Sequence, residues 1–141
     1  MRAVIDTNVV VSGMISRRSY PAKVLDSWAL GQFTAVVSPE LVREYTAVLT
    51  REKFAILGTT QRRMELLEKM LSLPWVVMVY PKIKVTLVQA DPCDNKIIEC
   101  AIEGNTEWIV TGDKHLLELR SVESVTIGTA EEFWQVQPKS K

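Results

Sequence analysis

The sequence is poor in the residues and motifs on which several common kinds of site depend. Its single histidine, His115, excludes a histidine-rich zinc site and argues against a Ser-His-Asp triad. Neither GxGxxG nor GxxxxGK occurs, so the sequence does not support a nucleotide-phosphate loop. The two cysteines, Cys93 and Cys100, fall in one predicted helix about 10 Å apart along its axis, too far for a disulfide. Two unpaired cysteines favour a reducing cytoplasm.

Net charge and long hydrophobic runs are also missing. Lysine and arginine total 17, as do aspartate and glutamate, which argues against a protein that coats nucleic acid through bulk charge. Residues 1–84 hold 12 basic and 7 acidic side chains, whereas residues 85–141 hold 5 basic and 10 acidic ones. The longest apolar stretches, such as Trp75 to Val79, are far shorter than the ~20 residues that span a bilayer. Asp6 also stands where a signal peptide would be apolar, so we expect no membrane association.

The length and composition fit one globular domain. A chain of 141 residues, 47% hydrophobic and 24% charged, can bury a core without a disulfide or a structural metal. Short β-branched runs alternate with helical patterns, which predicts an α/β fold with a central parallel sheet flanked by helices on both faces. We expect a single domain over residues 1–137 and a loose tail over residues 138–141. The predicted strands are 2–5, 34–37, 76–80, 108–110 and 124–127. The predicted helices begin near residue 8 and cover 20–30, 38–53, 60–73, 91–104, 114–119 and 130–136.

Carboxylates follow two of the predicted strands. Asp6 follows the first strand, and Asp113 follows the fourth after the Thr111-Gly112 turn. In an open parallel sheet, ligands bind beyond the carboxyl ends of the strands. Either aspartate could instead cap the helix that comes after it. Their coincidence at two strand ends of one sheet favours a shared site.

A third carboxylate, Glu44, lies on the helix that begins after Ser38. Helical periodicity puts it on the shoulder of the apolar arc of that helix. A carboxylate at the margin of a core needs a partner, because unpaired burial is costly. The alternative to a functional role is a salt bridge with Arg51 or Lys53.

A fourth carboxylate, Asp94, occupies the first turn of a later helix. Asp91 has the position of the helix cap, and Pro92 suits the first helical position. The helix dipole favours a negative charge at Asp94, so a structural role is the alternative there.

Gathered carboxylates need a cation. Like charges at close range raise one another's pKa and destabilise the fold. Oxygen-only ligands suit Mg²⁺ or Mn²⁺ rather than zinc. Magnesium keeps several waters, which can be activated for attack on phosphorus. The pattern therefore predicts a metal-assisted phosphodiester hydrolase.

Four segments carry a resemblance to a known family. They are Val4–Val9, Ser38–Glu44, Asp91–Lys96 and Ile109–Lys114. In this order, and over nearly the whole chain, they resemble PIN-domain ribonucleases, in particular the branch related to VapC-type toxins of toxin–antitoxin pairs. The resemblance implies an endoribonuclease that uses Mg²⁺ or Mn²⁺, often dimerises and is held inactive by a small antitoxin.

The same resemblance implies roles for individual positions. The catalytic and metal-binding carboxylates would be Asp6, Glu44, Asp94 and Asp113. The polar residues that orient ligands or a water would be Thr7, Asn8 and Thr111.

Basic side chains around the acidic centre are candidates for RNA contacts. Ordinary solvated surface is the alternative for all of them. The candidates are Arg17, Arg18, Arg51, Lys53, Arg62 and Arg63.

Apolar residues of the early helices predict a homodimer. We expect them to exceed what one small core can cover. They are Tyr20, Val24, Trp28, Met64, Leu67 and Leu71.

These patterns together predict a cytoplasmic, divalent-metal-dependent endoribonuclease, the toxin of an antitoxin-controlled pair. The alternative function is a catalytically silent PIN-like module that binds RNA or a partner protein. The presence of all four carboxylates favours the enzyme.

Overall fold

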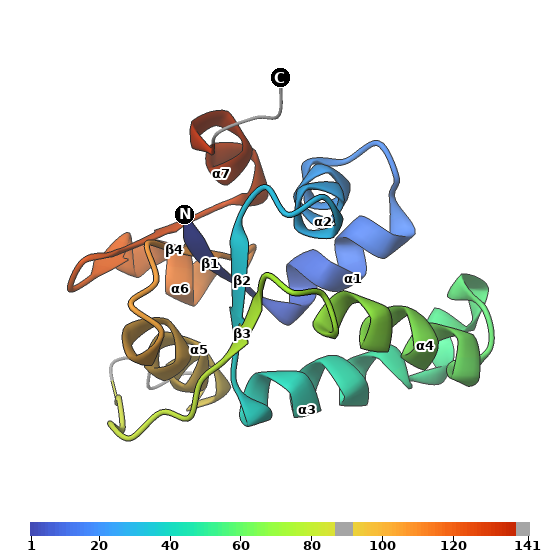
Figure 1. Cartoon of the computed structure of the whole chain (residues 1–141), viewed down its shortest axis with the longest axis horizontal. Coiled ribbons are helices and arrows are strands. Elements are labelled where there is room, and N and C mark those ends of the chain that lie inside the picture. Colours follow the sequence, from blue (N-terminus) through green and yellow to red (C-terminus); the bar gives the residue numbers. More distant parts are fainter. Residues whose placement is uncertain (87–91, 138–141) are drawn as a thin grey trace.

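The computed structural model describes residues 1–86 and 92–137 and has a six-stranded sheet at its centre (Figure 1). The strands are β1 (Arg2–Ile5), β2 (Thr34–Val37), β3 (Val76–Met78), β4 (Trp108–Val110), β5 (Ser121–Val122) and β6 (Val125–Gly128). They lie in the order β3-β2-β1-β4-β6-β5. All neighbours pair in parallel except β5 and β6, which are antiparallel.

Helices cover both faces of this sheet. They are α1 (Thr7–Ile15), α2 (Tyr20–Ala29), α3 (Pro39–Leu49), the 3₁₀ helix η1 (Glu52–Leu57), α4 (Thr60–Leu71), α5 (Pro92–Glu103), α6 (Lys114–Leu119) and α7 (Ala130–Val136). In Figure 1, α1, α2 and α4 lie on one side of the sheet, and α5 and α6 lie on the other. The predicted α/β fold is therefore confirmed. In the described part of the chain, no helix is long and apolar enough to cross a membrane.

The central strands are buried on both faces. Val4, Val36 and Ile109 have no exposed surface, as expected for the middle of a parallel sheet covered by two helical layers. The register of β1 with β4 places Ile5 opposite Val110, so the two strands end at the same level. The residues that follow them therefore meet at the carboxyl edge of the sheet, which is the lower edge in Figure 1.

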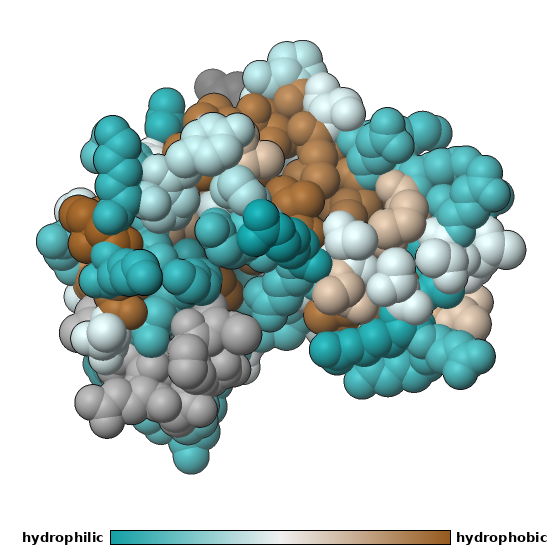
Figure 2. Space-filling model, turned by 90° about the horizontal axis from the view of Figure 1, so that it is seen from below, coloured by the Kyte–Doolittle hydropathy of each residue, from teal (hydrophilic) through white to brown (hydrophobic). Residues whose placement is uncertain are grey.

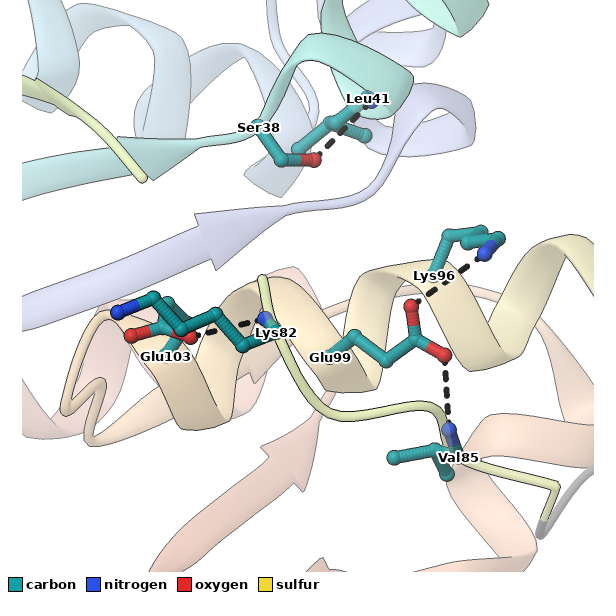
Figure 3. Close-up of polar contacts among 7 residues, drawn as sticks. All are labelled: Ser38, Leu41, Lys82, Val85, Lys96, Glu99 and Glu103. Carbon is teal, nitrogen blue, oxygen red and sulfur yellow. Dashed lines mark hydrogen bonds and ion pairs between the residues drawn. The ribbon is translucent and has the colours of Figure 1, made fainter. Parts of the chain in front are cut away.

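Helix α3 begins where the sequence predicts and ends earlier. The Ser38 hydroxyl accepts from the Leu41 N–H at 3.2 Å, and a proline occupies the first helical position (Figure 3). The predicted continuation to Lys53 is wrong, because α3 ends at Leu49 and η1 follows as a separate 3₁₀ helix.

Arg63, on α4, explains this early end. Its guanidinium is buried and donates to the carbonyls of Leu49 and Arg51, and its Nε donates to the Gly58 carbonyl at 3.1 Å. The last carbonyls of a helix need partners, and here a side chain from the next helix supplies them. The turn from α3 to α4 is thus held by one arginine.

The segment after β3 lies along α5. Strand β3 ends at Met78, two residues earlier than predicted. Glu103 accepts from the Lys82 N–H at 3.1 Å, and the buried Glu99 accepts from the Val85 N–H at 2.8 Å (Figure 3). Lys96 completes the cluster with an ion pair to Glu99 at 3.5 Å. Two carboxylates one turn apart thus fix this segment through its backbone.

Two further expectations differ from the structure or fall outside it. The sheet is not wholly parallel, because the unpredicted strand β5 turns back on β6 through Glu123, whose φ is +54°. The predicted tail, residues 138–141, lies outside the described residues, as does the predicted helix cap Asp91.

The six apolar residues that suggested a dimer pack within the chain itself. Val24, Trp28 and Leu67 are buried within the single chain, and Tyr20, Met64 and Leu71 are partly buried against the same core. One core covers more apolar surface than the sequence suggested, because α2 and α4 both pack inward. This argument for a homodimer is wrong, and the dimer itself stays a prediction.

Replacing Arg63 should destabilise the fold. We expect Arg63→Ala to lower the free energy of unfolding by about 2–4 kcal/mol, because several partly buried carbonyls lose their donor. Arg62→Ala is the matched control. Arg62 is exposed, so its replacement should change the free energy of unfolding by less than about 0.5 kcal/mol. Urea unfolding of both variants measures the difference, and equal losses would contradict the assigned role.

Candidate functional site

Asp6 directly follows β1 and accepts hydrogen bonds from several neighbouring donors. Its carboxylate is 4% exposed. Oδ1 accepts from the Thr7 N–H at 2.7 Å, and Oδ2 accepts from the Thr111 hydroxyl at 2.6 Å and from the Asn8 amide at 3.1 Å. Asp6 therefore caps α1, as the structural alternative proposed, and also faces the neighbouring strand end.

The Thr111-Gly112 turn ties Asp113 to the same network. Thr111 Oγ1 accepts from the Asp113 N–H at 3.0 Å, and Asn8 Oδ1 accepts from the Gly112 N–H at 3.0 Å. The Asp113 carboxylate accepts from the His115 N–H at 2.7 Å and so caps α6. The capping and shared-site interpretations are thus compatible for Asp113 as well.

Glu44 and Asp94 line the same cavity as these two aspartates. The cavity has a volume of about 340 Å³, and all four carboxylates are among its lining residues. Glu44, on α3, is half-buried, and Asp94, in the first turn of α5, is 5% exposed. The structure therefore brings together every carboxylate that the sequence singled out, and their catalytic role stays a prediction.

Figure 2 views the molecule from the side of the carboxyl ends of the strands. Hydrophilic residues cover most of this face, and hydrophobic residues show in a band near its middle. Within residues 1–86 and 92–137, no group of three or more His, Cys, Asp and Glu side chains is arranged to hold a metal ion.

The electrostatics of the cavity favour a positive partner for Asp6. Burial raises the pKa of Asp6 to about 6, and the charges of Glu44 and Asp113 act in the same direction. The hydrogen bonds from Thr111 and Thr7 oppose this shift. A proton or a cation is thus bound more readily here than at an ordinary carboxylate.

The predicted RNA-binding residues do not lie together at the acidic cavity. Arg51 is exposed and lines the acidic cavity. Arg17 and Arg62 line a larger cavity of about 960 Å³ between α1, α2, η1 and α4, and Arg18 is exposed in the turn after α1. Arg63 has only backbone and Thr60 oxygens as described partners, so we leave it out of any RNA surface.

Sequence reasoning missed two residues at the site. Phe54 lines the acidic cavity from η1, an element hidden by the predicted longer helix. Tyr45 is fully buried, and its hydroxyl donates to the Ile5 carbonyl, directly before Asp6. Burial raises the pKa of Tyr45 well above its ordinary value, so the hydroxyl stays a neutral donor. Its place on the apolar arc of α3 concealed this polar contact.

Taken together, these features define an α/β domain with an acidic site at the carboxyl edge of its sheet. The family model of the PIN domain matches residues 2–115, and the chain belongs to the PIN domain family. The predicted resemblance is therefore confirmed. PIN domains are generally nucleases.

Similar proteins share sequence or fold with this chain. The chain is 31% identical over 121 residues to an uncharacterized protein of Methanocaldococcus jannaschii, covering 85% of this chain and 76% of that protein. A chain of VapBC2 from Rickettsia felis, bound to a DNA fragment from the promoter, matches with a TM-score of 0.60 and 16% identity over 90% of this chain and 97% of that one. A domain of a functionally unknown M. jannaschii protein matches with a TM-score of 0.54 and 18% identity over 99% and 94%. At these identities the two structural matches establish the fold.

The shifted pKa of Asp6 predicts a pH dependence of stability. Since the folded pKa of about 6 lies above the ordinary 3.8, the unfolded chain loses this proton first. The contribution of Asp6 to stability is therefore fully present below pH ~4 and is lost as the pH rises to about 6. We expect Asp6→Asn to remove this loss, so that its stability relative to wild type improves by about 2 kcal/mol between pH 4 and 7.

Urea unfolding in EDTA at intervals between pH 4 and 7 checks this. Glu118→Gln, at an exposed glutamate, is the control and should keep the wild-type pH profile. A constant stability difference between Asp6→Asn and wild type would contradict the expected titration.

Proposed function

We propose that this PIN domain is a divalent-metal-dependent endoribonuclease that hydrolyses RNA phosphodiester bonds. One observation carries the proposal: four carboxylates from four separate parts of the chain line a single cavity at the carboxyl edge of the sheet. A purely structural set of caps and salt bridges would not need to converge. A catalytically silent binding module would not need the acidic cluster at all.

In chemical type, though not in the spacing that the described residues show, the donors of the cavity suit Mg²⁺ or Mn²⁺. Among the described residues that line the cavity, the charged ligands are carboxylates, and neither histidine nor cysteine is present. The raised pKa of Asp6 also supports a cation, because its negative charge is only partly compensated by the protein. A bound divalent cation would supply neutralisation of the phosphate and activation of a water for attack on phosphorus.

The chain's own residues supply orientation. Thr111 and Asn8 hold Oδ2 of Asp6 from two sides, which fixes the direction of the carboxylate. Thr7 Oγ1 is buried and has no hydrogen-bond partner in the described ranges, which suits a hydroxyl that orients a water. Arg51, exposed at the cavity, would contact a substrate phosphate.

We further infer that the nuclease is a cytoplasmic toxin held inactive by a small antitoxin. The likeness in fold to a chain of VapBC2 from Rickettsia felis supports this. The larger cavity supports it too, because Ile15 and Leu66, beside Met70, leave apolar side chains exposed along it. The observation to seek is an adjacent small reading frame that overlaps this gene and encodes a DNA-binding protein. Light scattering at tens of micromolar tests the predicted homodimer.

Loss of one carboxylate should abolish cleavage. We expect Glu44→Gln to lower the rate on labelled single-stranded RNA by at least about 100-fold in Mg²⁺ or Mn²⁺, because the substitution keeps the shape and removes the charge. Glu40→Gln, one turn earlier on the same helix and exposed, is the matched control and should cleave like wild type. Wild-type cleavage by Glu44→Gln, or cleavage in EDTA, would refute the proposal.

Divalent metal should stabilise the native protein. A cation that binds only the folded state at about tenfold its dissociation constant adds about 1.4 kcal/mol, which corresponds to a rise of a few degrees in Tm. Thermal scans with Mg²⁺, Mn²⁺ and EDTA measure this shift. Asp6→Asn should reduce the shift while Glu40→Gln keeps it. An identical Tm under all conditions would argue against a metal site.

A further inference from the structure

Helix η1 brings one aromatic ring to the acidic cavity. Phe54 lines the cavity, and among the described lining residues it is the only aromatic one. No residue of η1 is buried, and Phe54 itself is half-buried, with part of its surface packed against the core. The carboxylates do not need a ring beside them for metal binding, so its presence calls for another explanation.

The ring stands on a loop that is fixed at both ends. Arg63 donates to the carbonyls of Leu49 and Arg51 before η1 and to those of Gly58 and Thr59 after it. These acceptors are backbone atoms, so one buried guanidinium closes the loop without using any η1 side chain. The backbone on either side of Phe54 is therefore held in place in advance of any ligand.

Two cations accompany the ring. Lys53 Nζ lies over the Phe54 ring, 5.2 Å from its centroid, where a stacking base would take its place, and Arg51 lines the same cavity. Proteins that bind single-stranded nucleic acid combine an aromatic face, on which a base stacks, with cations that contact the backbone phosphates. The rim formed by these three residues has that composition.

We propose that Phe54 stacks on a nucleobase of the substrate while the adjoining phosphate reaches the carboxylates. In a duplex both faces of each base are covered by its neighbours, so only an unpaired nucleotide offers a face to the ring. A single-stranded substrate, as already used in the cleavage test, would allow this contact, and the new assignment is that Phe54 is the residue that contacts the base. The inference rests on the proposed nuclease function for the identity of the ligand.

Packing against the core is the structural alternative for Phe54, and two variants separate the roles. Phe54→Leu keeps an apolar side chain and loses the aromatic face. Ile56→Ala, on the same 3₁₀ helix, is the matched control, because Ile56 is 89% exposed and is not among the residues that line the acidic cavity. A packing role is retained by leucine, whereas a stacking role is not.

Binding is measured with single-stranded RNA that carries 2-aminopurine, whose fluorescence falls when the base stacks. Each variant is made in the Glu44→Gln background in Mg²⁺, so that the RNA is not cut. We expect quenching in the parent and in the Ile56→Ala variant, and none in the Phe54→Leu variant. Phe54→Leu should also weaken binding by about 10-fold. A duplex of the same sequence should bind weakly and without quenching.

Three results would overturn the inference: a parent that binds RNA without quenching, a Phe54→Leu variant that binds and quenches like the parent, and a duplex that binds as tightly as the single strand. The parent measurement remains decisive if Phe54→Leu does not fold. Wild-type cleavage tests the nuclease separately. Stacking without any cleavage would sink the proposed function and leave the role of Phe54 in RNA binding standing.

Discussion

A single hydrogen bond, from the Thr111 hydroxyl to the Asp6 carboxylate, joins the ends of two neighbouring strands, and the acidic site is arranged around it. The same hydroxyl oxygen accepts from the Asp113 N–H, so the start of α6 is placed relative to the end of β1. This bond depends on the register of β1 with β4, since a shift by one residue would turn the side chains to the other face of the sheet. The geometry of the site is therefore a property of the sheet.

Burial of the Asp6 carboxylate lowers the stability of the fold, and the packing of the surrounding core has to compensate for this loss. Asp6 is buried near two other carboxylates, and the protein compensates with donors from Thr7, Asn8 and Thr111 rather than with a cationic side chain at hydrogen-bond distance. A fold selected only for stability would replace such a group. Destabilising groups of this kind are characteristic of functional sites, where a ligand can supply the positive charge that balances the carboxylates.

The sequence allows prediction of those features that depend on short-range patterns. Asp6 and Asp113 follow strands directly, and parallel strands end at one edge, so their proximity could be inferred. Helical periodicity was enough for Glu44. The end of α3 could not be inferred, because Arg63 imposes it from 14 residues further along the chain. Phe54 was missed for the same reason, since it lies on the 3₁₀ helix that this contact creates.

Because Arg63 holds the backbone on both sides of η1, the sequence of η1 can vary between related proteins. Arg63 donates to backbone carbonyls before and after η1, at Arg51 and Gly58. Exchange of the six residues between these two positions would therefore leave the hydrogen bonds of Arg63 in place. This segment is then an exchangeable stretch of chain beside a constant acidic cavity. Under the proposed function, relatives that keep the arginine and vary residues 52–57 would keep the acidic cavity and differ in the bases that they prefer beside it.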